Sequence, residues 1–273
     1  MTQKKSNITP NINSRLSVQV SLTGLSFLVT DPDTRETLFF SEKKFNTSRT
    51  PEEILLAIEE EIDQIEALQP IFETVNVVYS NNVYSTVPTP LFDESKASEY
   101  LKFNSKILNN DYIAYDQLDN HDITIVYVPY VNINNYFFER YGIFKYYHKT
   151  TIFLNNVLNN EKHSNAIKMY IHIQFDQFDC VVVKNGRTEL CNTFSYKTPE
   201  DLIYYVLFCI EQLSLNPDTL PIIICGEIEL GDSNYAILYR YIRHISFTED
   251  NEASDLNDTL DVSHKNYILK STP

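Results

Sequence analysis

The chain has 273 residues, an ordinary globular composition and a formal net charge of −15. This length is enough to bury a sizeable core in one large domain or two modest ones. The negative charge repels a phosphate backbone, so we expect no binding to nucleic acid.

The sequence predicts neither a secretory nor a membrane-bound protein. Residues 1 to 15 are polar and lack the apolar centre of a signal peptide. No apolar run approaches the roughly 18 residues that a membrane-spanning helix needs. Four cysteines occur without a CxxC pair, which favours reduced, buried thiols (Cys180, Cys191, Cys209 and Cys225). We therefore expect a cytoplasmic protein that does not contact a membrane.

The first half begins with a polar segment, 1–14, that we expect to be a disordered lead-in. Alternation of apolar and polar residues then predicts an antiparallel meander of three strands, 16–22, 25–30 and 37–40. The next signal is a helix opening: Thr50 is a natural N-cap, Pro51 suits the first turn, and Glu53 completes a capping box. That helix ends before Pro70, and a buried parallel strand follows at 75–79.

The middle of the chain is less regular. We expect an extended loop around Pro88 and Pro90. Beyond it, the apolar spacing predicts helices at 94–109, 133–141 and 151–158 and strands at 123–128 and 143–147.

The second half repeats the opening pattern. Strands are expected at 169–175, 178–183 and 187–194, with a hairpin turn at Asn185-Gly186. A capped helix opens at Thr198-Pro199, and a strand at 221–225 precedes a glycine turn. A helix at 233–244 and a short strand at 245–248 complete the pattern.

Local sequence matches support an internal duplication. Residues 35–38 (RETL) echo 187–190 (RTEL), and 51–55 (PEEIL) echo 199–203 (PEDLI), in the same order and on matching elements. A period this long predicts two similar lobes and no solenoid. We place the lobes at 15–165 and 166–273, the second with an acidic loop near 249–261.

The pattern of three antiparallel strands, a helix and a parallel strand, occurring twice, resembles the actin-like ATPase superfamily of actin, sugar kinases and the Hsp70 ATPase domain. More narrowly, it resembles an uncharacterised bacterial family of about this length with a degenerate actin-like fold. The resemblance implies an α/β protein of duplicated actin-like (ribonuclease H-like) two-lobe architecture, with a mixed sheet that contains a three-strand meander in each lobe.

The same resemblance indicates where a nucleotide would bind. It assigns Thr23 and Gly24 to one phosphate, Asp176 to magnesium, and Gly226 with Glu227 to the nucleoside. All three loops depart from the superfamily pattern. The first lacks a carboxylate, the second lacks a glycine, and Glu227 stands where a second glycine is usual and would repel phosphate.

We favour ordinary hairpin and strand-end roles for these five residues, because Asp at a tight turn bonds its own backbone. We therefore assign no catalytic residue beyond the weak candidate Asp176. We expect no metal site, since the six histidines show no ligand spacing. No cofactor is expected, although ATP with magnesium remains possible.

Two functional hypotheses follow from intact architecture with altered phosphate loops. The first is a catalytically inactive actin-like protein that binds or scaffolds an unknown protein partner. The alternative is a weak ATPase or small-molecule kinase that binds Mg-ATP through atypical loops. A third possibility, a purely structural protein that self-associates, would use the aromatic-rich run 136–147.

Overall fold

The computed structural model describes residues 14–103, 105–108, 111–118, 120–248 and 264–273. The chain divides into two compact units. Unit 1 comprises Met1–Thr151 with Thr272–Pro273, and unit 2 comprises Ile152–Ser271. The acidic segment 249–261 and nearly all of the segment 1–14 lie outside the described residues.

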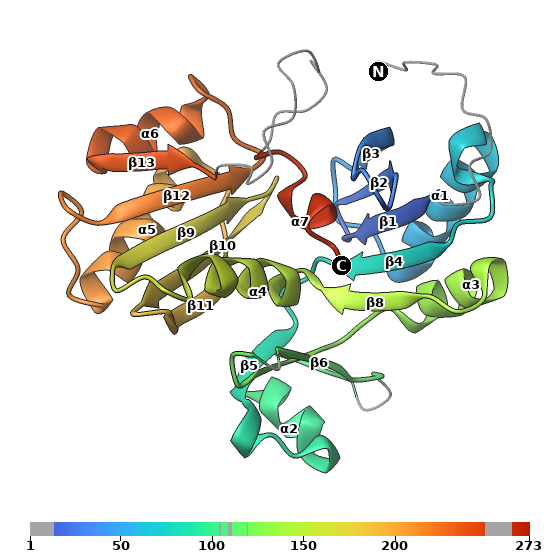
Figure 1. The fold of residues 1–273 in the computed structure, drawn as a ribbon, viewed down its shortest axis with the longest axis horizontal. Coiled ribbons are helices and arrows are strands. Elements are labelled where there is room, and N and C mark those ends of the chain that lie inside the picture. The colour runs from blue at the N-terminus through green and yellow to red at the C-terminus, as the bar shows by residue number, and fades with distance from the viewer. Residues whose placement is uncertain (1–13, 104, 109–110, 119, 249–263) are drawn as a thin grey trace. The chain divides into compact units, whose positions relative to one another are not determined.

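Unit 1 is built on a five-stranded mixed sheet in the order β3-β2-β1-β4-β8 (Figure 1). The first three strands pair antiparallel and form the expected meander, whereas β4 and β8 run parallel to β1. The strands are β1 (Arg15–Val20), β2 (Gly24–Thr30), β3 (Thr37–Lys44), β4 (Thr74–Tyr79) and β8 (Lys145–His148).

Helix α1 (Pro51–Gln64) begins as the sequence predicts. The Thr50 hydroxyl accepts the Glu53 N–H at 3.3 Å, and the Glu53 carboxylate accepts the Thr50 N–H at 2.9 Å. These two bonds satisfy amides that have no partner within the helix. Ile54, Ile58 and Ile62 recur at helical spacing and are fully buried, so one face of the helix packs into the core.

In the middle of the chain, two predictions from the sequence are wrong. The region expected to be a loop contains β5 (Tyr84–Pro88), which joins β7 (Ile123–Tyr127) and β6 (Ala114–Leu118) in an antiparallel sheet of order β5-β7-β6. The helix expected at 94–109 is only one turn and a half, α2 (Ala97–Lys102). The other helical elements of this unit are η1 (Glu66–Leu68), η2 (Thr89–Leu91), η3 (Glu94–Lys96) and α3 (Val131–Tyr141).

Unit 2 contains a second five-stranded mixed sheet, in the order β11-β10-β9-β12-β13 (Figure 1). Its first three strands are again antiparallel, and β12 and β13 run parallel to β9. Both residues of the Asn185-Gly186 turn have positive φ, as a tight hairpin requires. The strands are β9 (Ile167–Ile173), β10 (Gln177–Lys184), β11 (Arg187–Ser195), β12 (Pro221–Gly226) and β13 (His244–Phe247).

Helices cover both faces of the unit 2 sheet. Helix α5 (Pro199–Gln212) has the predicted capping box of Thr198 and Asp201, and it packs on the face formed by Met169 and Ile171. Helix α4 (Lys149–Glu161) covers the opposite face, where the Phe153 ring lies 5.6 Å from the His172 ring. The remaining helices are α6 (Ser233–Tyr241), which ends three residues before the predicted boundary, and α7 (Tyr267–Lys270).

None of the helices in the described part of the chain is long and apolar enough to cross a membrane.

Candidate functional site

The turn that carries Thr23 and Gly24 uses its own polar groups. It joins β1 to β2, and the Ser21 N–H donates to the Gly24 carbonyl at 3.0 Å. The Thr23 N–H donates to the Ser21 Oγ at 3.2 Å, and that same hydroxyl donates to the Gly24 carbonyl at 3.0 Å. A phosphate cradle offers free backbone amides, whereas the amides of Ser21 and Thr23 are already bonded within this turn.

The Asp176 turn of unit 2 has the same backbone pattern. It joins β9 to β10, and the Gln174 N–H donates to the Gln177 carbonyl at 2.9 Å. The Tyr196 N–H donates to the Asp176 carbonyl at 3.0 Å. Phe175, beside Asp176, exposes 57% of its surface, so the tip of this turn presents an aromatic ring next to a carboxylate.

Thr23 and Asp176 occupy equivalent places in the two units. In unit 1 the Phe45 N–H donates to the Thr23 carbonyl at 2.9 Å, as the Tyr196 N–H does to Asp176. The two turns therefore share a hydrogen-bond pattern and differ in chemistry, with a hydroxyl in one and a carboxylate in the other.

Gly226 ends β12 and Glu227 follows it, at the end of the sheet where Asp176 lies. The Glu227 N–H donates to the Ile173 carbonyl at 2.7 Å, which ties this segment to the end of β9. Gly226 has φ +91°, and a Cβ there would lie 2.1 Å from the same Ile173 carbonyl oxygen. Only glycine fits at this position. In unit 1 the equivalent bond runs from the Ser80 N–H to the Val20 carbonyl at 2.8 Å, so Ser80 stands where Glu227 stands.

Three carboxylates act electrostatically on the Tyr196 side chain. Its hydroxyl donates to the Gln174 carbonyl at 2.7 Å. Burial raises the pKa of Tyr196 to about 12, and the negative charges of Glu227, Asp232 and Asp176 contribute to that rise. Asp232 is held in place as the N-cap of α6, where it accepts the Tyr235 N–H at 2.6 Å. We call Asp176, Glu227 and Asp232 the acidic cluster.

The structure thus divides the five predicted residues into two groups. Asp176, Gly226 and Glu227 lie at one end of the unit 2 sheet, whereas Thr23 and Gly24 belong to unit 1. Sequence reasoning missed Tyr196 and Asp232. A signal for Asp232 was present, because Asp followed by Ser before an apolar helical pattern is a typical N-cap.

The chemistry of the acidic cluster is anionic. Negative charge around a buried phenol disfavours a further anion such as phosphate. In the described part of the chain, no group of three or more His, Cys, Asp or Glu side chains is arranged to hold a metal ion.

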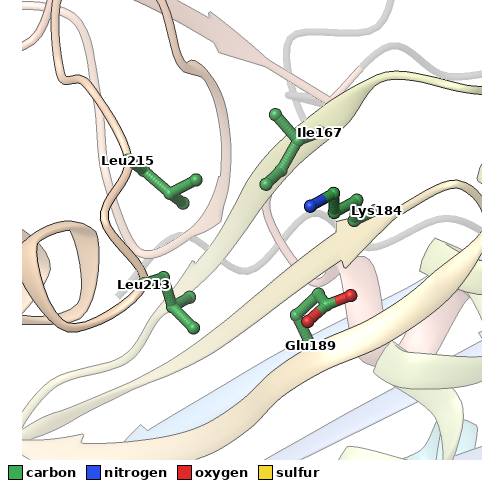
Figure 2. Close-up of a pocket in the computed structure, with 5 residues that line it drawn as sticks. All are labelled: Ile167, Lys184, Glu189, Leu213 and Leu215. Carbon is green, nitrogen blue, oxygen red and sulfur yellow. The ribbon is translucent and has the colours of Figure 1, made fainter.

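A small pocket lies at the other end of the unit 2 strands. Figure 2 shows Leu213 and Leu215, from the segment after α5, across from Ile167, Lys184 and Glu189 on three strands. Its volume is about 50 Å³, too small for a nucleoside, and it contains none of the five predicted residues.

Unit 1 contains a half-buried carboxylate that the sequence gave no reason to select. Asp116, on β6, accepts hydrogen bonds from the Thr151 hydroxyl at 2.6 Å, the His148 N–H at 2.9 Å and the Tyr127 hydroxyl at 3.0 Å. Burial raises the pKa of Asp116 to about 6, although these three donors oppose the rise. The group is fully bonded within the protein, which indicates a structural role.

Comparison with known proteins identifies the family. A family described as a protein of unknown function (DUF3822) matches residues 3–245. The chain belongs to this family. No curated protein matches the sequence.

Two solved structures show the fold. A Bacteroides thetaiotaomicron protein, described as having an actin-like ATPase fold and unknown function, superposes with a TM-score of 0.77 at 21% identity, over 90% of this chain and 94% of that one. A PilM-PilN type IV pilus biogenesis complex superposes with a TM-score of 0.59 at 8% identity, over 88% of this chain and 89% of that one. The chain therefore has the α/β mixed-sheet architecture of actin-like ATPases, as expected.

Proposed function

We propose that this protein is a non-catalytic member of the actin-like group that binds or scaffolds a protein partner. The observation that carries the proposal is the acidic cluster around Tyr196. It occupies the loops that the actin-like resemblance assigns to magnesium and the nucleoside. Phosphoryl transfer depends on positioned amides and on cations that neutralise the phosphates. An anionic cluster of this kind opposes the approach of a triphosphate.

The Thr23 turn supports the same conclusion from unit 1. Its hydroxyls and amides bond to one another, so binding a phosphate there would first require breaking those bonds.

We infer that the two units arose by duplication. The support is the matching set of bonds around Thr23 and Asp176 and around Ser80 and Glu227, together with the same strand order in both sheets. Duplication explains why both units have the same strand order and an equivalent turn after the first strand. The side chains of the two turns, Thr23 and Asp176, have since become different.

The partner is a protein, and the site of action is the cytoplasm. Similarity of fold to a protein in the PilM-PilN complex supports a role within an assembly. The net charge of −15 favours a partner with a basic surface.

An ATP hydrolysis assay tests the proposal. The wild-type protein, Asp176→Ala and Asp218→Ala would each be assayed with Mg-ATP, Asp218 serving as an exposed acid at the other end of β12. We expect the three proteins to show the same turnover as a protein-free blank. Magnesium-dependent turnover that is lost in Asp176→Ala and kept in Asp218→Ala would overturn the proposal in favour of a weak ATPase or kinase.

A further inference from the structure

Residues 272–273 are bound to unit 1, although the 120 residues before them form unit 2. The Asn76 Nδ2 donates to the backbone oxygen of Pro273 at 2.9 Å, and an Arg15 guanidinium nitrogen donates to the Thr272 carbonyl at 3.2 Å. Thr272 is only 4% exposed. Two side chains of the sheet thus hold a short segment by its backbone oxygens, which are acceptors that every peptide has.

The binding position lies on the polar face of the unit 1 sheet. Asn76 on β4 is in register with Ser17 on β1, and both are buried. Their neighbours along β1, Leu16 and Val18, point to the other face, where the apolar core lies, because successive residues of a strand alternate. We call the place formed by Arg15, Ser17 and Asn76 the backbone slot.

Two polar atoms in the slot have no hydrogen-bond partner among the described residues. They are the Asn76 Oδ1 and the Arg15 Nε, both buried. Asn76 is completely inaccessible to solvent. Its Oδ1 therefore loses its hydrogen bond to water on folding and gains no hydrogen bond within the described residues. Residue 273 cannot satisfy this oxygen through its backbone, because Pro273 has no amide proton to donate. An amide side chain can bond a peptide in two ways at once, through its NH₂ and its oxygen, and here only the first is used.

We propose that the backbone slot is a docking site for an extended peptide of a partner protein, which the segment 272–273 fills in cis. The better ligand has a residue other than proline at the position of Pro273, so that its N–H bonds the Asn76 Oδ1. A second copy of this chain would bring the same proline and gain no such bond, which favours a different partner. This inference rests on the proposed function and specifies the ligand class.

Unit 2 provides an internal contrast. Aligning the two sheets on the bonds from Ser80 to Val20 and from Glu227 to Ile173 places Ile223 at the position of Asn76 and Tyr170 at that of Ser17. The polar face of unit 1 is therefore not imposed by the fold, and its slot is a property of these side chains.

A peptide titration of the full chain tests the docking site. The probes are two fluorescent peptides, Tyr-Ile-Leu-Lys-Ser-Thr-Ala and Tyr-Ile-Leu-Lys-Ser-Thr-Pro, which copy residues 267–272 and differ only in the last residue. We expect the peptide with alanine to bind about tenfold more tightly, the effect of one added hydrogen bond. Equal affinities, or no saturation by the alanine peptide up to millimolar concentration, would overturn the proposal.

Two variants assign the effect to the slot. Asn76→Ala should remove the difference between the peptides. Asn132→Ala should keep it, because the Asn132 Nδ2 also donates to a proline carbonyl, that of Pro51 at 2.8 Å, outside the slot. A difference that persists in Asn76→Ala contradicts the proposed bond.

A third variant works within the intact chain and does not depend on the folding of Asn76→Ala. Pro273→Ala supplies the missing N–H in cis, so the alanine peptide should bind several-fold more weakly than to the wild type. Unchanged peptide affinity would contradict the proposed docking at the backbone slot.

The peptide titration and the ATP assay separate the two proposals. If the peptide experiments fail while ATP turnover stays at the level of the blank, the docking site is wrong and the non-catalytic function stands. If turnover appears, the proposed function itself fails.

Discussion

The two units share a backbone pattern and differ in the side chains placed on it. In each unit, a hydrogen bond closes the turn that follows the first strand of the sheet, β1 or β9. In each, the residue after the parallel neighbour, β4 or β12, donates its N–H to the last carbonyl of that first strand. At these equivalent points unit 1 has Thr23 and Ser80, whereas unit 2 has Asp176 and Glu227. The comparison teaches that hydrogen bonds of the main chain preserve the frame while leaving the chemistry of the loops free to change.

The faces of the two sheets differ in the same way. Unit 1 places Asn76 where unit 2 places Ile223, and its polar face binds the segment 272–273 where unit 2 is covered by α4. The corresponding face of unit 2 forms side-chain bonds instead: the Tyr170 hydroxyl donates to the Glu161 carboxylate of α4 at 2.6 Å, and His172 bonds Asp179 at 3.1 Å.

The largest expected loss of stability comes from replacing Gly226, at the end of β12 in unit 2. Gly226→Ala should lower the free energy of unfolding by about 3 kcal/mol or more, because the new Cβ would meet the Ile173 carbonyl at a positive φ. Denaturant unfolding measures the loss. The matched control is Gly231→Ala, which has the same φ of +91° and open space around the Cβ, and should cost about 1 kcal/mol. Equal losses would mean that close packing at Gly226 is unimportant.

The second prediction concerns Asp116, which lies in the three-stranded sheet of unit 1. Its pKa is about 6 in the folded protein against a usual 3.8, so the folded state binds more protons than the unfolded state between these values. Stability should therefore fall as the pH rises from about 4 to about 6, by about 3 kcal/mol from this group alone.

The variant Asp116→Asn isolates that contribution. Because asparagine does not titrate, the stability difference between wild type and variant should change across this pH range, as measured by denaturant unfolding at each pH. A difference that stays constant from pH 4 to pH 7 would show that the Asp116 pKa is not raised.

The smallest expected loss of stability, from removing a helix N-cap, should be the same in both units. Thr50→Ala and Thr198→Ala each remove the hydroxyl of a capping box with the same two bonds. Each should lower the free energy of unfolding by about 1 kcal/mol. A loss at one helix only would show that the two boxes, alike in geometry, differ in energy.

Much of this fold could be predicted from local signals. The capping boxes of Thr50 and Thr198, the Asn185-Gly186 turn and the alternation in β1 and β9 each depend on residues close in sequence. The β5-β7-β6 sheet was missed because β5 ends at Pro88, a residue typical of loops, and its pairing partner lies far along the chain.

The candidate site was predictable only where it follows directly from a strand end. Asp176, Gly226 and Glu227 stand at or beside strand ends, where local sequence signals could select them as candidates. The effect of three carboxylates on Tyr196 and the bond from Asn76 to Pro273 depend on neighbours 20 to 197 residues apart, which only tertiary structure brings together.

Calorimetric titration of the purified protein with ATP, with and without magnesium, tests the central claim most directly. The account predicts no heat of binding up to millimolar ATP from folded protein, because the acidic cluster repels the phosphates and the amides of Ser21 and Thr23 are already bonded within their turn. Micromolar binding that requires magnesium, and that weakens in Asp176→Ala, would contradict it and make the loops a working nucleotide site.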